Sequence, residues 1–240
     1  MRAIALLGRH WPELGPLGLA ELPDGGALAL SRGARPKAYA HTDPNEDAAL
    51  LVRTDAGVLL AVADGFNGCE VAELAIAEAR ARANDLVEAS GEAFRAQVVR
   101  LADAVRAALP RGSRSRSCLV LAALRGERVE LASLGDSSAW LVGAGDSLAV
   151  ENSLLIGDRE PLARARPDLW HSQWKRPNGA RLALVSDGVT NFTAERAIPG
   201  MIAAAASDLD AARALATAAC DGGAGDNVAV AAFAGRAGVA

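Results

Sequence analysis

Short apolar runs alternate with longer segments of helical periodicity along the 240-residue chain. The clearest β pattern is a hairpin, in which residues 48–52 and 58–63 are apolar and the intervening Arg-Thr-Asp-Ala-Gly is a turn sequence. Residues 1–36 are rich in Gly and Pro, and residues 16–33 indicate two short strands around the turn Pro-Asp-Gly-Gly. These segments predict paired strands ahead of the first helix.

Two helices are predicted next, over residues 70–90 and 93–109, because apolar residues recur there at intervals of three and four. Their Ala-rich faces indicate packing surfaces and not partner-binding heptads. Three short apolar runs at residues 118–124, 129–134 and 139–142 then predict a second batch of strands.

The last part of the chain mixes both patterns. Residues 144–180 contain Trp170, Trp174, three prolines and several charges, which predicts a loop-rich excursion with one short helix. An apolar strand ending in Asp-Gly is expected at residues 181–188, followed by helices over 194–206 and 209–220 and a final strand. Strands in two batches with helices between them favour one α+β layered domain over residues 1–240, since no repeat or long linker divides the chain.

Composition narrows the class of protein. Half of the residues are apolar and 22% are charged, which is typical of a globular domain, and the net charge of −4 indicates neither nucleic acid nor an anionic membrane as partner. No apolar window is long enough to span a bilayer, and the amino-terminal run is too short for a signal peptide. Three widely spaced cysteines fit a reducing compartment, so we expect a cytoplasmic protein, monomeric in solution. The Arg-rich segment 110–117 is interpreted as a solvated loop.

Acidic residues stand beside the ends of the predicted strands, where strand periodicity does not require them. Taken singly, each Asp-Gly or Asp-Asn is an ordinary turn sequence. If they converge in space, a cation is needed between them, and oxygen ligands without His or Cys favour Mg²⁺ or Mn²⁺. Two such ions could activate a bridging water and hold a phosphoryl group. The residues are Glu46, Asp47, Asp64, Asp136, Asp187 and Asp226.

The ordered motifs Asn-Glu-Asp-Ala, Val-Ala-Asp-Gly-Phe-Asn-Gly, Leu-Gly-Asp-Ser-Ser, Leu-Val-Ser-Asp-Gly-Val and Gly-Asp-Asn-Val-Ala-Val resemble those of the PPM-type (type 2C) metal-dependent protein phosphatases. The resemblance covers residues 38–233. It implies a four-layer α-β-β-α sandwich of two antiparallel sheets flanked by helices, with a binuclear Mg²⁺ or Mn²⁺ site at one end.

The resemblance also implies a role for each acidic residue. Asp64 would bridge two ions and act with Glu46 and Asp47 in catalysis, Asp47 by orienting metal-bound water. Glu46 and the carbonyl of Gly65 would complete the shell of one ion, and Asp136 would hold a third, weaker ion. The other ion would be bound by Asp187 and by Asp226, whose loop Asn227 would support.

The sequence departs from the family pattern at the phosphate-binding and proton-donating positions. Thr42 stands where members commonly carry a phosphate-binding Arg, and Arg35, Lys37 and His41 are the candidate replacements. Phe66 stands where some members have a His that acts as general acid. Protonation of the leaving group would then fall to water or another group.

Three further departures lie after the metal motifs. Ser138 replaces the Arg of a Gly-Asp-Ser-Arg motif, residues 151–155 replace an Asp-His-Ser motif, and residues 168–177 form an unusual sequence where the family has a flap. Four other residues receive structural interpretations: Trp140 and Cys69 as buried packing residues, His171 as a half-buried histidine, and Ser117 as a structural hydroxyl.

The leading hypothesis is a bacterial phosphatase that hydrolyses phosphoserine or phosphothreonine in protein substrates, paired with a Ser/Thr kinase, by direct attack of metal-activated water. Two alternatives remain open. One is a catalytically weak binding or regulatory protein with a phosphatase fold, and the other is a hydrolase of a small phosphorylated metabolite.

Overall fold

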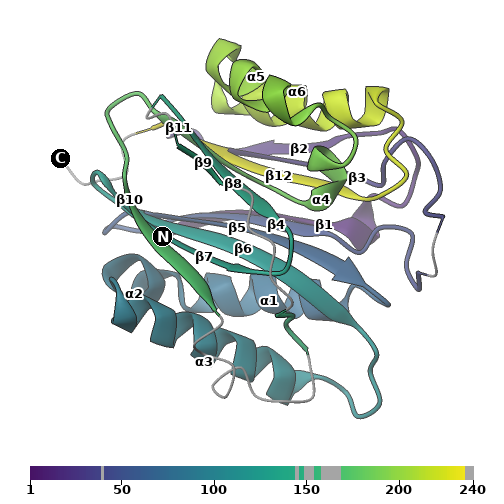
Figure 1. The fold of residues 1–240 in the computed structure, drawn as a ribbon. Helices are drawn as coiled ribbons and strands as arrows, with labels where there is room; N and C mark the ends of the chain where they lie inside the picture. Colours follow the sequence, from purple (N-terminus) through teal and green to yellow (C-terminus); the bar gives the residue numbers. More distant parts are fainter. Residues whose placement is uncertain (39–40, 144–145, 149–153, 158–168, 236–240) are drawn as a thin grey trace.

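The computed structural model describes residues 1–38, 41–143, 146–148, 154–157 and 169–235. These residues form four layers, in which two antiparallel sheets lie face to face and each is covered by helices on its outer side (Figure 1). The α-β-β-α order implied by the sequence resemblance is confirmed. None of the helices in the described part of the chain has the length and apolar character needed to cross a bilayer.

Each sheet has six strands, and all of its neighbours pair antiparallel. The first sheet has the order β1 (Arg2–Leu7), β4 (Ala48–Arg53), β5 (Val58–Phe66), β6 (Arg116–Arg125), β7 (Arg128–Leu134) and β10 (Trp170–Lys175). The second has the order β2 (Gly18–Glu21), β3 (Ala27–Ser31), β12 (Val228–Phe233), β11 (Arg181–Val185), β8 (Ser138–Val142) and β9 (Asp146–Leu148).

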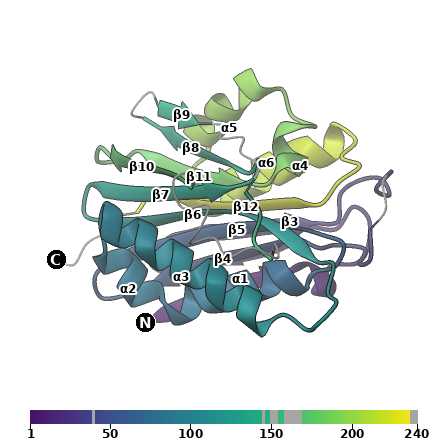
Figure 2. The same cartoon turned by 60° about the horizontal axis from the view of Figure 1, so that its bottom comes forward.

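The helices fall into two groups by the sheet that they cover. Three cover the first sheet, namely α1 (Glu70–Ala81), α2 (Ala83–Glu88) and α3 (Glu92–Ala108) (Figure 2). The second sheet carries α4 (Asp187–Thr190), α5 (Ile198–Ala204) and α6 (Asp208–Asp221). The described residues also contain two 3₁₀ turns, η1 (Gly8–His10) and η4 (Glu195–Ala197).

Strand β4 shows why the central strands are apolar throughout. Leu50 and Val52 face the α1–α3 helices, whereas Ala49 and Leu51 point into the core between the two sheets. Successive side chains of a strand leave opposite faces, so a strand that is covered on both sides must be apolar at every position. A third core, beneath α5 and α6, lies on the outer face of the second sheet.

The structure confirms the two predicted hairpins, the second batch of strands and the last strand, and it corrects several boundaries. The helix expected over 70–90 is two helices, because the backbone at Arg82 leaves helical geometry (φ −100°, ψ 12°). The helix expected over 194–206 begins as the 3₁₀ turn η4 before α5. Strand β1 was missed.

Two corrections bear on the site. Strand β5 does not stop before Asp64 but continues to Phe66, because β6 pairs with it as far as Arg116. The basic segment 110–117 is therefore not wholly a solvated loop, since Arg116 and Ser117 belong to β6 and Ser115 is buried.

The excursion over residues 144–180 contains strands β9 and β10 where they are described. Strand β10, which continues the first sheet beside β7, was not predicted because its sequence Trp-His-Ser-Gln-Trp-Lys is largely polar. Residues 144–145, 149–153 and 158–168 lie outside the described residues, so the short helix expected in this region and most of the motif at 151–155 cannot be compared with the structure.

Candidate metal centre

The acidic residues gather because the strands that precede or follow them are neighbours. In the first sheet, the start of β4 pairs with the later part of β5, so the residues before Ala48 lie beside Asp64. In the second sheet, the end of β11 pairs with β12, which brings the residues after Val185 and those before Val228 together. The name acidic cluster is used below for Glu46, Asp47, Asp64, Asp136, Asp187 and Asp226.

A possible metal-ligand set lies at the centre of this cluster. Asp64, Asp136 and Asp187 each offer a carboxylate oxygen, and these oxygens lie within 4.8 Å of one another. Asp136 is oriented by the thiol of Cys118, whose Sγ lies 3.2 Å from its Oδ1. Asn191 holds Asp187 in the same way, its Nδ2 donating to Oδ2 at 2.9 Å. Asn191 was not predicted as a site residue, although its position four residues after Asp187, directly after α4, is a recognisable signal.

The glycines of the two Asp-Gly motifs allow a second acidic loop to approach. A Cβ atom on Gly65 would collide with the carbonyl oxygen of Glu46, and one on Gly188 would collide with the carbonyl oxygen of Asn227. Each glycine therefore brings the carboxylate before it close to another acidic segment. This close approach is the structural reason for a glycine after Asp64 and after Asp187.

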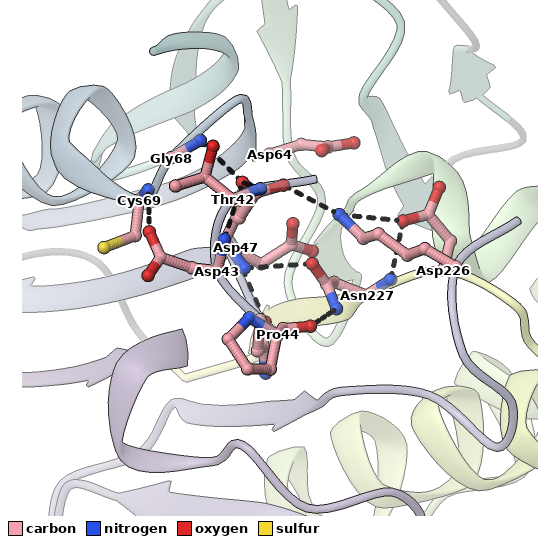
Figure 3. Close-up of polar contacts among 12 residues, drawn as sticks. Thr42, Asp43, Pro44, Asp47, Asp64, Gly68, Cys69, Asp226 and Asn227 are labelled. Carbon is pink, nitrogen blue, oxygen red and sulfur yellow. Dashed lines mark hydrogen bonds and ion pairs between the residues drawn. The ribbon is translucent and has the colours of Figure 1, made fainter. Parts of the chain in front are cut away.

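Glu46 is held by protein donors on both carboxylate oxygens. Its Oε1 accepts hydrogen bonds from the backbone N–H groups of Gly68 at 2.5 Å, Thr42 at 3.1 Å and Asp43 at 3.3 Å. Its Oε2 lies 3.2 Å from Nζ of Lys37. Glu46 thereby fastens the loop after Asp64 to the segment before β4, and Figure 3 shows Thr42 and Gly68 from these two segments beside each other.

Lys37 is the basic residue that enters the acidic cluster. Its Nζ also lies 3.3 Å from Oδ1 of Asp226, and its side chain is only 2% exposed. Burial alone would lower the pKa of Lys37, but the charges of Asp47, Asp226 and Glu46 outweigh this effect and raise the pKa above its ordinary value. The structure therefore places an ammonium group between two residues expected to serve different metal ions.

Asp47 is a buried carboxylate of the acidic cluster with few hydrogen-bond donors around it. It is 1% exposed, and its two carboxylate oxygens form no close hydrogen bond to a described residue, although the Lys37 ammonium group and the Ser186 hydroxyl lie near enough to lower its pKa. Burial raises the pKa of Asp47 to about 8, against the opposing attraction of Lys37. A buried carboxylate with so few close donors is costly, so Asp47 is suited to a ligand or a water held by a ligand.

Burial and the repulsion of neighbouring carboxylates also raise the pKa values of Asp64 and Asp187. Burial, followed by repulsion from Asp47 and Asp187, raises the pKa of Asp64 well above its usual range. Burial raises the pKa of Asp187 to about 6, although its hydrogen bond with Asp64 lowers it. Carboxyls in this state either retain protons or bind a cation. With carboxylate oxygens as its donors, the acidic cluster fits a hard divalent cation such as Mg²⁺ or Mn²⁺.

The other candidates for phosphate binding lie outside the cluster. Thr42 contributes its backbone N–H to Glu46, His41 is exposed, and the guanidinium of Arg35 lies against Gly223. Phe66 ends β5 opposite Arg116. Of the three basic residues that were considered as replacements for the missing Arg, the structure brings Lys37 to the carboxylates.

The structural interpretations of four other residues agree with the fold. Trp140 is 2% exposed within a core, and Cys69 is buried, with a pKa that burial and Asp43 raise to about 11. His171 is partly buried, and its Nε2 lies 2.8 Å from Oε2 of Glu130. Ser117 donates its hydroxyl to the carbonyl of Asp64 at 3.0 Å, which is a structural role beside the cluster.

Asn227 supports more than the loop of Asp226. Its Oδ1 accepts a hydrogen bond from the backbone N–H of Glu46 at 2.9 Å. Its Nδ2 donates to the carbonyl of Arg32 at 3.2 Å and to that of Pro44 at 3.1 Å (Figure 3). Asn227 therefore joins the β12 end of the cluster to the segment that carries Glu46.

Comparison with solved structures places this geometry in a known fold. A variant of a bacterial serine phosphatase superposes with a TM-score of 0.70, at 20% identity over 87% of this chain and 97% of that one. PppA, a key regulatory component of T6SS in Pseudomonas aeruginosa, gives a TM-score of 0.69 at 23% identity over 88% of this chain and 96% of that one. The chain has the PPM-type phosphatase fold.

A third structure with this PPM-type fold bears on the acidic cluster. The catalytic domain of the serine/threonine protein phosphatase PstP, solved in complex with two manganese ions, gives a TM-score of 0.64 at 22% identity over 91% of this chain and 99% of that one. No protein-family model matches the chain, and no curated protein matches it in sequence. At these identities, the likeness is one of fold.

Proposed function

We propose that the chain is a metal-dependent phosphatase that hydrolyses phosphoserine and phosphothreonine in proteins. The observation that carries the proposal is the convergence of Asp64, Asp136 and Asp187 within 4.8 Å, at one end of a fold shared with serine/threonine phosphatases. Carboxylates this close either keep protons or bind a cation, and a divalent ion is the cation that their oxygens favour.

In this proposal, Asp64, Asp136 and Asp187 hold Mn²⁺ or Mg²⁺. When bound, a divalent cation supplies an activated water nucleophile and neutralises charge on the phosphoryl group. Asp47 would orient the attacking water, because its two oxygens are buried and form no close hydrogen bond to a described residue. Phe66 cannot transfer a proton, so the leaving alkoxide takes its proton from water.

Lys37 sets the number of ions in this proposal. Its Nζ lies 3.2 Å from Oε2 of Glu46 and 3.3 Å from Oδ1 of Asp226 and neutralises their charge. These two residues therefore need no further cation in the resting protein. The chain would then bind one ion tightly at Asp64, Asp136 and Asp187, where the PstP complex contains two manganese ions. Two or three ions, as the family resemblance implies, would require Lys37 to move.

The test is hydrolysis of a small aryl phosphate and of a phosphothreonine peptide with Mn²⁺, with Mg²⁺ and with a chelator. We expect activity that depends on the ion and disappears on chelation. Asp64→Asn should reduce the turnover number by about 1,000-fold or more with the fold retained, since it removes a charge at the centre of the metal site. Unchanged activity of Asp64→Asn, or activity in the chelator, would refute the assignment. Parallel assays with phosphorylated metabolites decide the substrate class.

A second candidate function is a binding or regulatory protein with this fold and little turnover. The occupation of Glu46 by Lys37 and three backbone N–H groups favours it, because these contacts use both oxygens of a residue expected to serve the metal. Absence of aryl phosphate hydrolysis with saturating Mn²⁺, in a protein that still binds the ion, would select this alternative.

A further inference from the structure

A cavity of about 720 Å³ opens beside the loop that follows Asp64. Three arginines from different elements line it: Arg106 from α3, Arg114 from the loop after α3, and Arg116 from the start of β6. The name arginine cavity is used for this space. Arg114 and Arg116 belong to the basic segment 110–117, which the proposed reaction does not use.

The arginine cavity is built onto the same loop as the acidic cluster. Asn67, three residues after Asp64, lines it in a left-handed conformation (φ 56°). The buried Ser115 ties the two sides together, because its hydroxyl donates to the carbonyl of Gly68 at 2.5 Å and accepts from the backbone N–H of Val71 at 3.2 Å. Three residues of extended chain span at most about 11 Å, so the cavity begins within that distance of Asp64.

The charge of the arginine cavity is a local feature, since the chain as a whole has a net charge of −4. None of its described lining residues is acidic. Two carboxylates contact its lining: that of Asp103 lies 3.9 Å from Nε of Arg106, and that of Glu70 accepts a hydrogen bond from Ser113 at 3.4 Å. Arg114 is exposed and forms no ion pair with any described residue.

We propose that the arginine cavity binds carboxylate side chains of the substrate, two to four positions from the phosphorylated residue. The proposal rests on the proposed phosphatase function and adds a preference for acidic protein substrates. A guanidinium group binds a carboxylate through two parallel hydrogen bonds, and an extended peptide advances about 3.3 Å per residue. A peptide whose phosphoryl group lies at the acidic cluster therefore places a neighbouring Asp or Glu over Arg114 and Arg106.

The experiment compares phosphothreonine peptides that differ only at positions two to four on either side of the phosphothreonine, where they carry Glu, Gln or Lys. We expect kcat/KM to be about tenfold higher for the Glu peptide than for the Gln peptide, and lower still for the Lys peptide. The preference should shrink as salt is raised, because the arginines are partly exposed. Equal kcat/KM values for the three peptides would overturn the proposal.

The variant to test is the double substitution Arg106→Gln with Arg114→Gln, and Arg111→Gln is the matched control. Arg111 is exposed in the same loop but does not line the arginine cavity. The double variant should lose the preference for the Glu peptide to within about twofold, whereas the control should keep it. Both should hydrolyse a small aryl phosphate as the parent protein does. A double variant that keeps the preference would contradict the proposal.

Binding measurements separate this proposal from the proposed function. The same peptides, labelled with a fluorophore, are titrated with protein and followed by anisotropy. A parent protein that hydrolyses nothing but binds the Glu peptide at least about fivefold more tightly than the Gln peptide would refute the phosphatase and support the cavity assignment. Hydrolysis of the aryl phosphate together with equal affinity for all three peptides would support the phosphatase and refute the cavity assignment.

Discussion

Nζ of Lys37 lies 3.2 Å from Oε2 of Glu46, and the side chains of both residues are buried. The same ammonium group lies 3.3 Å from Asp226, so one lysine joins the two sheets' acidic loops. An ammonium group at this place neutralises these two carboxylates, as a metal ion would neutralise Asp64, Asp136 and Asp187 in the proposed function. The metal-binding behaviour of the chain should therefore depend on Lys37.

Lys37→Met should destabilise the protein in chelator by about 3 kcal/mol or more, because it leaves Glu46 and Asp226 buried without their cation. In Mn²⁺ the variant should bind one more ion than the parent protein, since the two carboxylates become available. Thermal unfolding and calorimetric titration with Mn²⁺ measure the two effects.

Lys175→Met is the control for Lys37→Met. Lys175 is 81% exposed and pairs with Glu127 at 3.3 Å on the surface, so its substitution should change the free energy of unfolding by less than about 0.5 kcal/mol. Equal Mn²⁺ stoichiometry in the parent protein and Lys37→Met would show that Lys37 does not occupy an ion's place.

Without metal, the stability of the protein should fall as pH rises from about 4 to about 8. The folded state raises the pKa of Asp47 to about 8 and of Asp187 to about 6, so it keeps protons that the unfolded chain releases near pH 4. Each such group therefore opposes folding increasingly until pH passes its folded pKa. This is the opposite of the usual behaviour of a carboxylate in an ion pair.

The measurement is the melting temperature in chelator at pH 5.5, 7 and 8.5, for the parent protein and for Asp47→Asn. We expect the parent protein to lose stability over this range, and Asp47→Asn to melt at least about 3 °C higher than the parent at pH 8.5. Saturating Mn²⁺ should weaken the pH dependence, because the ion replaces the protons. A parent protein that gains stability from pH 5.5 to 8.5 in chelator would contradict this prediction.

The members of the acidic cluster could be predicted from their immediate neighbours in the sequence. Each carboxylate lies where an apolar run meets a turn residue, and this pattern can be read from neighbours in the sequence. The glycine of each Asp-Gly was also recognisable, but its structural reason was not. The collision of a Gly65 Cβ with Glu46, or of a Gly188 Cβ with Asn227, involves loops that are distant in sequence.

What could not be predicted depends on pairing between distant elements. Lys37 enters the cluster because the loop after β3 and the loop before β12 are adjacent, as the pairing of those two strands requires. The polar strand β10 is held against β7 by the buried Glu130, which accepts hydrogen bonds from Gln173 at 2.7 Å and pairs with His171. No period-two apolar pattern marks such a strand.

Asn227→Ala should destabilise the protein by about 3 kcal/mol and weaken its affinity for Mn²⁺. The substitution removes three hydrogen bonds at a residue that is 1% exposed, and it leaves the backbone N–H of Glu46 without its acceptor. Asn191→Ala, at an exposed residue that bonds only to Asp187 through its side chain among the described contacts, should cost less than about 1 kcal/mol. Denaturant unfolding distinguishes the two, and similar losses for both would show that Asn227 does not join the loops.

Ala substitutions of Gly65 and Gly188 should each destabilise the protein by about 2–3 kcal/mol, because the added methyl group would push the loop of Glu46 or of Asn227 away. The displacement would move Glu46 away from Asp64 in the first variant, and the loop of Asp226 and Asn227 away from Asp187 in the second. The affinity for Mn²⁺ should therefore fall as well. Gly200→Ala is the matched control. Gly200 lies in α5 with no atom near its Cβ position, and Ala is the better helix former, so this variant should gain about 0.5–1 kcal/mol. Denaturant unfolding and Mn²⁺ titration of the three variants measure both effects, and a Gly188→Ala protein as stable as Gly200→Ala would mean that the two acidic loops do not need this close backbone approach.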